Sequence, residues 1–414
     1  MIATFAIPVI LAVMLATLFF DRTSWRHRKR WLRLLAWLLP VAYCAYTAYM
    51  ASYPYYFPDK IASFHRYVDS LFIFVLPCVL VALGTLIGRW MKRPRSGLIA
   101  GWLVALVALA VWVYGSLVGF RQLEVVRVEF ASKDLPPAFD GYRIVKFSDL
   151  HLGTYALGRQ DVLRRIVDSI NAQHADLAVF TGDIQNKEPS EIKEFMPLLS
   201  TIEAKDGVFT VLGNHDYTMY SNVTDPVDVG RNQGNTEGWQ LDMGWQLLKN
   251  SHAYIRRDSS RIVIAGMEND GEPGGRFPQN GDINRALYGV KRSDFVVMLE
   301  HDPTAWQRKI LPHSHAQLTL SGHTHGGQFE ILGWSPASLK YRQYNGMYRA
   351  GDRALYVTKG LGGVIPFRFG TKPEIVVITL KTSPSSPGGK KLIDGKNSNC
   401  TAATDAFSVF STVP

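Results

Sequence analysis

The first 120 residues contain four apolar stretches, each long enough to cross a bilayer as a helix. A spanning helix needs about 20 apolar residues, because the hydrocarbon core is roughly 30 Å thick. Four such runs in succession favour transmembrane helices over the buried core helices of a soluble protein. The sequence therefore predicts a membrane domain at residues 1–120, with spans at about 1–20, 31–52, 71–88 and 98–120.

The first stretch also has the length of a cleavable signal peptide. However, no basic segment precedes its apolar run, and its charged residues follow the run. A signal peptide has the opposite order of charge and apolar residues. We therefore expect this stretch to be retained as a helix.

The net charge of +10 is concentrated in the membrane half. Up to residue 120 there are twelve Lys or Arg against three Asp, a net charge of +9, which leaves about +1 for the rest. Ten of these twelve lie in or beside the first and third loops, and such basic loops stay cytoplasmic. With four spans, everything after residue 120 is then extracytoplasmic, as is the aromatic second loop, 53–70. A nucleic-acid partner would need the charge on the soluble half, so we expect none.

From residue 121 onward, short apolar runs alternate with an amphipathic segment and turn-rich segments. Leu163, Ile166, Val167 and Ile170 form one apolar helical face between the first two runs. This order predicts an α/β domain, which we assign to residues 121–380. Strands are expected at 143–147, 177–181, 208–212, 261–266, 295–299, 316–320, 354–358 and 374–380. The polar segment 219–236 predicts an irregular loop, and the Ser/Pro/Gly/Lys-rich segment 381–414 predicts a disordered tail.

Side chains that can bind metal ions follow five of these strands. Because sites in α/β sheets form beyond the carboxyl ends of strands, we expect these side chains to meet at one edge. Each of these residues alone is common at the end of a strand, but their ordered combination is specific. The residues are Asp149, His151, Asp183, Asn214, His215, Asp216, His301, His323 and His325.

The chemistry of this set indicates divalent metal ions. Mixed oxygen and imidazole ligands suit Mn, Fe or Zn better than Ca or Mg, and the absence of cysteine argues against a structural zinc. Two ions about 3.5–4 Å apart, bridged by one carboxylate, can clamp a phosphoryl group and activate a water molecule. The three cysteines of the chain suggest no disulfide framework.

The ordered motifs D-x-H, G-D, G-N-H-D, H and G-H-x-H resemble the five sequence blocks of the calcineurin-like metallophosphoesterase superfamily, over about residues 120–380. The resemblance implies a four-layer αββα sandwich and a metal-dependent phosphoric ester hydrolase. It implies that the first metal ion is held by Asp149, His151, Asp183 and His325. It further implies that the second ion is held by Asp183 as bridge, Asn214, His301 and His323.

The same resemblance implies roles for three neighbouring residues. His215 would be the catalytic histidine, protonating the leaving oxygen or stabilising phosphoryl charge while a hydroxide held by the two ions attacks. Asp216 and Asn186 would orient the site from behind the ligands. No cofactor besides the two metal ions is expected.

Other features separate this chain from some members of the superfamily. The G-D motif continues as Ile184–Gln185–Asn186, without the Asp-Arg pair of protein Ser/Thr phosphatases. The stretch from Ser321 onward and the four spans are similar to a membrane-associated bacterial branch that includes UDP-2,3-diacylglucosamine pyrophosphatase-like phosphodiesterases. Candidates to line the substrate pocket, or for ordinary surface and core positions, are Tyr341, Arg342, Tyr344, Tyr348, Lys359 and Arg368.

Several other histidines are expected to have no catalytic role. His313 and His315 fall outside the motif order, and His27, His65, His174 and His252 are expected to be solvated or locally hydrogen-bonded.

These features together lead to one functional hypothesis and two alternatives. We expect a phosphodiesterase or pyrophosphatase in the inner membrane, with its catalytic domain on the periplasmic side. Its substrate would be lipid-linked or nucleotide-type, and membrane lipids would surround its helices. The alternatives are a general phosphomonoesterase and a non-catalytic metal-binding sensor or scaffold that keeps the fold.

Overall fold

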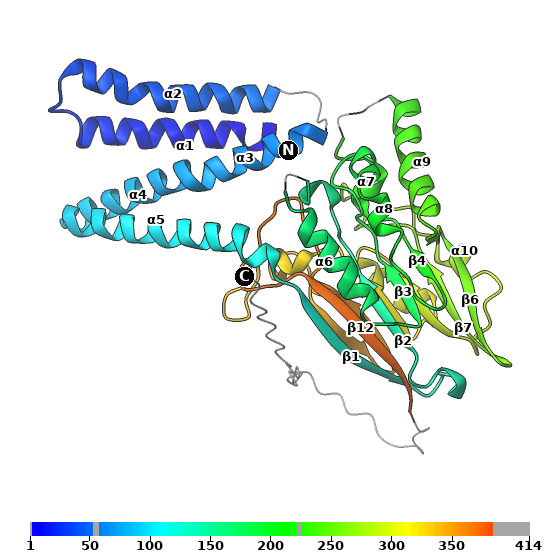
Figure 1. Cartoon of the computed structure of the whole chain (residues 1–414). Helices are drawn as coiled ribbons and strands as arrows, with labels where there is room; N and C mark the ends of the chain where they lie inside the picture. Colours follow the sequence, from blue (N-terminus) through cyan, green and yellow to red (C-terminus); the bar gives the residue numbers. More distant parts are fainter. Residues whose placement is uncertain (1, 53–57, 157, 222, 224, 384–414) are drawn as a thin grey trace, which may run out of the picture.

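The structure, a computed structural model, describes residues 2–52, 58–156, 158–221, 223 and 225–383. A bundle of long helices extends from one side of a two-sheet domain (Figure 1). Four helical segments are long and apolar enough to cross a membrane, as the sequence predicted: Phe5–Thr23, Arg30–Ser52, Ile61–Trp90 and Pro94–Arg121.

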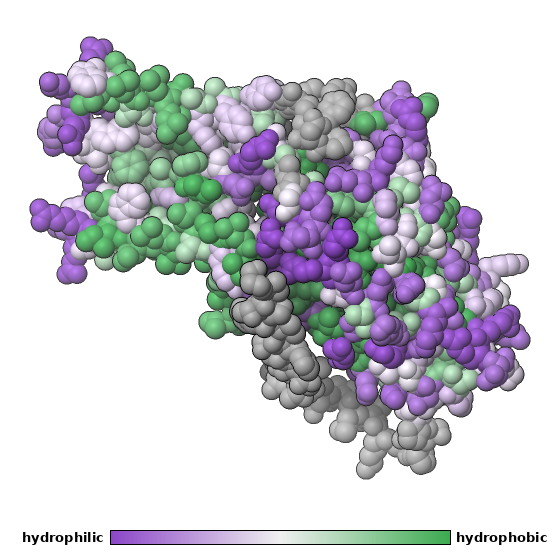
Figure 2. Space-filling model, in the orientation of Figure 1, coloured by the Kyte–Doolittle hydropathy of each residue, from purple (hydrophilic) through white to green (hydrophobic). Residues whose placement is uncertain are grey.

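The bundle consists of helices joined by two short turns at the end farthest from the domain (Figure 1). Hydrophobic residues cover much of its outer surface, and hydrophilic residues gather at that far end (Figure 2). Both basic loops of the sequence, around Arg28 and around Lys92, are these turns. The helices are α1 (Ile2–Thr23), α2 (Arg30–Ser52), α3 (Pro58–Ser70), a π-helical turn (Leu71–Val75), α4 (Leu76–Trp90) and α5 (Pro94–Leu117).

Four glycines bring α4 and α5 into close contact: Gly84, Gly88, Gly97 and Gly101. A Cβ atom on Gly97 would collide with the carbonyl oxygen of Gly84, and one on Gly101 would lie 2.9 Å from the Cα of Val81. Small residues allow membrane helices to approach closely, where dispersion contacts hold them together. The pair α4–α5 is therefore packed through its glycine faces.

The expectation of a loop at 53–70 is wrong for residues 58–70, which form α3. Residues 53–57 lie outside the described part. Ile61, Phe64, His65 and Val68 are buried at helical spacing, so α3 has one face packed inside the protein. A Cβ on Gly153 would collide with Ile61, which shows that α3 lies against the catalytic domain. Tertiary packing of this face stabilises a helix in a segment whose sequence predicted a loop.

Two six-stranded sheets form the centre of the domain. The first has the order β1-β12-β2-β3-β4-β5, in which β2 to β5 are parallel and β12 is antiparallel to β2. Its strands are β1 (Glu124–Ser132), β2 (Arg143–Phe147), β3 (Leu177–Phe180), β4 (Val208–Thr210), β5 (Gln246–Leu247) and β12 (Glu374–Thr382). Thus β12 extends two residues into the expected tail, and residues 384–414 lie outside the described part.

The second sheet has the order β10-β11-β9-β8-β7-β6, parallel in its four central strands and antiparallel at both edges. Its strands are β6 (Ser251–Arg257), β7 (Ser260–Gly266), β8 (Phe295–Leu299), β9 (Leu318–Ser321), β10 (Gly346–Ala350) and β11 (Arg353–Val357). The sequence analysis did not predict β1, β5, β6 or β10. All four are edge strands, where burial is partial and the apolar signal is weak.

The two sheets pack face to face, and helices cover their outer faces. Ile144, Val179, Ile264 and Val297 are among the fully buried residues of the layer between the sheets. Helix α6 (Gln160–Asn171) covers the first sheet with Val162, Leu163, Ile166, Val167 and Ile170. Short helical segments that include Ile283, Trp306 and Ile310 cover the second. This is the αββα sandwich that the sequence analysis expected.

The expectation of an irregular loop at 219–236 is wrong for its second half. Residues Pro226–Asp242 form α9, which begins where the Asp225 side chain accepts hydrogen bonds from the backbone N–H groups of Val227 and Asp228. Proline at the first helical position supports this start. Thr236 and Gln240 are buried and bond Gln185 and Thr210. Polar contacts to the domain therefore stabilise a helix that has little apolar surface of its own.

Candidate metal centre

The loops after β2, β3, β4, β8 and β9 meet at one edge of the sandwich, where they bring the predicted ligands together. Asp149, His151, Asp183 and His325 each offer a ligand atom, and these atoms lie within 4.8 Å of one another. Asp183, His301 and His323 form a second such group. Each of the two groups has the size of a coordination sphere for one cation, and the Asp183 carboxylate belongs to both.

Asp183 lies between the two groups. Its Oδ2 atom is 3.6 Å from His151 Nε2 and 3.2 Å from His301 Nε2. The carboxylate is almost fully buried, and its Oδ1 atom accepts a hydrogen bond of 2.8 Å from the backbone N–H of His215. One oxygen is therefore fixed by the protein, while the other faces imidazole nitrogens on both sides. This is the arrangement expected of a carboxylate shared by two cations.

The buried atoms without a hydrogen-bond partner among the described residues include His151 Nε2 and the side-chain oxygen of Asn214. The amide nitrogen of Asn214 donates to the Tyr220 hydroxyl over 2.9 Å. A buried polar atom without a partner is costly, so such an atom in a cluster calls for a ligand. The two atoms fit a site for divalent cations.

The protonation of the imidazoles also fits a metal centre. Burial lowers the pKa of His151 and of His325 well below the usual value, so both rings are neutral, the form that binds metals. Although burial opposes it, the Asp183 carboxylate raises the pKa of His301 to about 10. The Nδ1–H of His301 donates to the Thr181 carbonyl over 2.7 Å, so the titrating proton lies between His301 Nε2 and Asp183. A cation bound between these two groups would replace that proton.

Five of the seven predicted ligands have a left-handed backbone conformation. The φ angles of Asp149, His151, Asp183, His323 and His325 lie between 48° and 74°. Residues other than glycine rarely adopt this conformation, and non-glycine examples concentrate at functional sites. The sharp turns allow residues two apart, such as Asp149 and His151, to direct both side chains into the same site.

His215 lies beside the cluster but belongs to neither ligand group. Its Nδ1–H donates to the Asn186 carbonyl over 2.5 Å, so Nε2 takes no part in that hydrogen bond. Its ring stacks on Tyr220 with centroids 4.0 Å apart and meets the His151 ring edge-on at 4.6 Å. These contacts hold the ring in one orientation. Asn186 acts through its backbone carbonyl, whereas its side-chain nitrogen donates to Thr154 Oγ1 over 3.1 Å.

Asp216 connects two of the ligand loops. Its carboxylate accepts hydrogen bonds from the backbone N–H groups of Gly213, Asp183 and Ile184, at 2.8, 2.9 and 3.0 Å. We predict that Asp216→Asn lowers metal affinity roughly 10- to 100-fold, because an amide cannot accept all three bonds and the Asp183 loop shifts. Metal titration followed by mass spectrometry measures the effect. The exposed Asp242→Asn is the control, and unchanged metal binding in Asp216→Asn would contradict the prediction.

The candidates for the substrate pocket have different positions. The Tyr341 hydroxyl lies 2.9 Å from His323 Nε2, at the site. Arg368 is fully buried, and its guanidinium donates to the carbonyl oxygens of His325, Gly360 and Gly362. Lys359 Nζ lies 3.9 Å from Glu374 Oε2, and Arg342 is exposed. The backbone N–H of Tyr344 donates to the Tyr348 hydroxyl, and the Tyr344 carbonyl accepts a hydrogen bond from the hydroxyl of Thr324.

Besides Tyr220, two further contributors to the site were not predicted. Glu191 accepts hydrogen bonds from the backbone N–H groups of Asn186, Lys187 and Gly153, and so connects the first two ligand loops. Phe277 meets the His323 ring at 4.9 Å from the loop after β7. No motif surrounds either residue, so only the folded chain identifies them.

The histidines that were expected to have no catalytic role include His313, His315 and His65. His313 and His315 precede β9, at the opposite end from the ligands. His65 is buried and bonds the Val364 carbonyl.

Comparison with known proteins agrees with this geometry. Residues 142–327 match the family described as calcineurin-like phosphoesterase. The chain is 33% identical over 323 residues to a zebrafish (Danio rerio) transmembrane protein with metallophosphoesterase domain, covering 75% of this chain and 70% of that protein. It is 31% identical over 304 residues to the uncharacterized metallophosphoesterase YkuE of Bacillus subtilis, covering 70% of this chain and 99% of that protein.

A bovine (Bos taurus) protein with the same name as the zebrafish relative is 28% identical over 292 residues, covering 68% of this chain and 62% of that protein. The family match, the two relatives above 30% identity and the Asp/His cluster lead to one conclusion. The chain belongs to the calcineurin-like metallophosphoesterase superfamily and is a metal-dependent phosphoesterase.

Proposed function

We propose that this enzyme hydrolyses phosphodiester or pyrophosphate bonds in a substrate that is anchored in the membrane. The observation that carries the proposal is the direct contact between the bundle and the ligand loops. The backbone N–H of Arg368 donates to the Gly115 carbonyl of α5 over 3.0 Å, while its guanidinium donates to the carbonyl of His325 over 3.1 Å. Ile61 of α3 lies against Gly153, two residues after His151. The ligand loops thus face the membrane helices, which favours a lipid-linked substrate.

The assignment of individual ligands follows from the two groups at the site. We assign Asp149, His151, Asp183 and His325 to one divalent ion. We assign Asp183, Asn214, His301 and His323 to the other. Bound there, two ions such as Mn, Fe or Zn neutralise phosphoryl charge and lower the pKa of a water molecule.

The remaining side chains position the substrate and move protons. With Nδ1–H bonded to Asn186, His215 can present a protonated Nε2 to the leaving oxygen. The Tyr341 hydroxyl and the Phe277 ring flank His323 and are placed to contact the substrate.

A panel of substrates at full metal loading tests the function. The proposal expects hydrolysis of bis-p-nitrophenyl phosphate and of a lipid pyrophosphate, with elemental analysis showing two divalent ions per chain. Preferential hydrolysis of the p-nitrophenyl monoester would identify a general phosphomonoesterase instead. Metal binding without hydrolysis of any of these would identify a sensor or scaffold.

We propose that residues 1–120 anchor the catalytic domain, residues 121–380, on the extracytoplasmic face of the cell membrane, the periplasmic face in a bacterium with an outer membrane. The basic turns around Arg28 and Lys92 lie at the end of the bundle farthest from the domain (Figures 1 and 2). Basic loops stay cytoplasmic, which places the domain on the other side.

Cysteine labelling of the full chain tests this orientation. In a background with Cys44, Cys78 and Cys400 replaced by Ser, we introduce Asp242→Cys or Arg28→Cys, both at exposed positions. A membrane-impermeant maleimide is expected to label Asp242→Cys in intact spheroplasts and Arg28→Cys only after permeabilisation. The reverse pattern would place the catalytic domain in the cytoplasm.

A further inference from the structure

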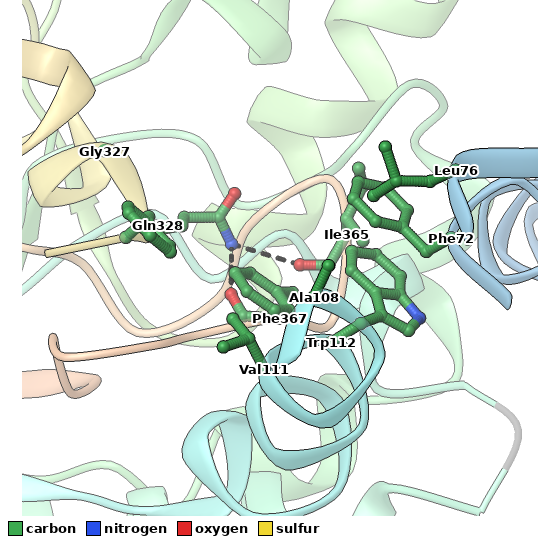
Figure 3. Close-up of a pocket in the computed structure, with 10 residues that line it drawn as sticks. Phe72, Leu76, Ala108, Val111, Trp112, Gly327, Gln328, Ile365 and Phe367 are labelled. Carbon is green, nitrogen blue, oxygen red and sulfur yellow. Dashed lines mark hydrogen bonds between the residues drawn. The ribbon is translucent and has the colours of Figure 1, made fainter. Parts of the chain in front are cut away.

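A cavity of about 480 Å³ lies where the membrane helices meet the catalytic domain (Figure 3). Phe72, Leu76, Ala108 and Val111 line it from the helices, and Gln328 and Phe367 line it from the domain. This volume falls within the range of roughly 300–1,000 Å³ that is typical of ligand sites.

The lining presents almost only hydrocarbon to an occupant. The amide nitrogen of Gln328 donates to the carbonyl oxygens of Ile365 and Phe367, at 3.1 and 3.0 Å, so it is already paired (Figure 3). The indole N–H of Trp112 donates to Asp69 over 3.2 Å. With both of these polar groups bonded within the protein, the cavity favours an apolar ligand.

Stacked rings hold the cavity wall in place. The Phe72 and Trp112 rings are parallel within 2°, with centroids 3.7 Å apart, and the Phe367 ring also stacks on Trp112, with centroids 4.9 Å apart. These rings come from three separate parts of the chain: the π-helical turn, α5 and the loop before β12. The wall is therefore built by the contact between bundle and domain.

The cavity continues the surface that would contact lipid. On α5, Val104 and Val107 are 54% and 64% exposed. Each precedes a cavity residue, Ala108 or Val111, by four positions, so all four share one helix face. The exposed apolar face of a candidate membrane span therefore leads into the cavity.

The opposite wall belongs to a ligand loop. Gly327 and Gln328 line the cavity and follow His325 by two and three residues. His325 Nε2 lies 3.7 Å from the Asp149 carboxylate, within the first ligand group. Phe367 precedes Arg368, which bonds the His325 carbonyl. A molecule in the cavity thus touches the segment that carries a metal-binding side chain.

We propose that this cavity binds one acyl chain of a membrane lipid whose phosphate is hydrolysed at the metal centre. The inference rests on the proposed function and names its substrate class: phospholipids and related lipids with a hydrocarbon chain beside the scissile phosphate. The chain enters along the Val104–Val107 face of α5, and the headgroup reaches past the His325–Gln328 loop.

Two substrates and one matched pair of variants test the inference in full-length protein in phosphatidylcholine nanodiscs. The substrates are p-nitrophenyl hexadecyl phosphate and bis-p-nitrophenyl phosphate, which lacks an alkyl chain. Ala108→Trp fills the cavity, whereas Ala110→Trp places the same ring on the exposed side of α5. We expect Ala108→Trp to lower the ratio of kcat/KM values, hexadecyl over bis-p-nitrophenyl, about tenfold, because several methylene groups lose their burial. Ala110→Trp should leave this ratio unchanged.

Leu76 lines the cavity from α4, so Leu76→Trp should also lower the ratio of kcat/KM values, hexadecyl over bis-p-nitrophenyl. An unchanged ratio in both cavity variants would overturn the inference, as would an equal fall in Ala110→Trp.

A binding measurement separates this inference from the proposed function. Phosphatidylglycerol with a diazirine in its acyl chain, in phosphatidylcholine vesicles, should label peptides containing residues 108–112 and 365–367 on illumination. Ala108→Trp should remove this labelling and Ala110→Trp should keep it. Labelling confined to exposed helix faces and insensitive to Ala108→Trp would overturn the inference. If wild-type protein hydrolyses neither substrate but shows the cavity label, the proposed function fails and lipid binding stands.

Discussion

Asp183→Asn is expected to lower kcat/KM by on the order of 10³-fold or more and to remove at least one metal ion per chain. Asp183 Oδ2 faces His151 on one side and His301 on the other, so this one carboxylate contributes to both ligand groups. An amide has nearly the same shape but no charge. Under the proposed assignment of two ions, the loss reports the missing anion between them.

The measurement combines steady-state hydrolysis of bis-p-nitrophenyl phosphate with elemental analysis of purified protein. The matched control is Asp294→Asn, another buried carboxylate, which pairs with Arg261 just before β8. That control should lower the melting temperature and keep both ions. Full metal content and full turnover in Asp183→Asn would show that Asp183 does not bridge the two groups.

His215→Ala is expected to lower kcat by roughly 10²- to 10⁴-fold while metal content stays unchanged. The His215 ring lies outside both ligand groups, and it is the backbone N–H of His215, kept in the variant, that bonds Asp183. The side chain therefore serves the reaction and not metal retention.

The dependence on the leaving group distinguishes proton transfer from positioning. p-Nitrophenolate leaves readily without a proton, whereas an alkoxide needs one. If His215 is the acid, His215→Ala should impair an alkyl phosphodiester more strongly than bis-p-nitrophenyl phosphate. His252→Ala is the control, because His252 lies on β6, belongs to neither ligand group and bonds the carbonyl of Ala286. Equal losses for both substrates would indicate a positioning role, and loss of metal a structural one.

Contact between the bundle and the ligand loops gives the membrane helices a role in shaping the site. A Cβ on Gly119 would collide with the Arg368 carbonyl, and one on Gly115 would collide with Phe367. The loop that contains Phe367 and Arg368 therefore lies directly against α5, and Arg368 of this loop bonds the His325 carbonyl. Domain and bundle form a continuous structure around the ligand loops.

The sequence by itself determined the elements that have a recognisable pattern over a short stretch of residues. Apolar length predicted the four candidate spans, because a bilayer imposes a minimum run of apolar residues. Short apolar runs followed by Asp, Asn or His predicted both the parallel strands and the edge where the candidate ligands meet, because parallel strands end on the same side. The ligand types alone indicated divalent metal ions.

Only the tertiary structure decided what depends on contacts between distant segments. Asp183 lies between two imidazoles because three loops converge there, and five left-handed residues turn their side chains inward. Helices α3 and α9 form where long-range packing and polar contacts outweigh weak local signals. The acyl-chain cavity needs walls from α5 and from the loop before β12, more than 200 residues apart. No local pattern encodes such a pairing, because its free energy comes from surfaces that meet only in the folded chain.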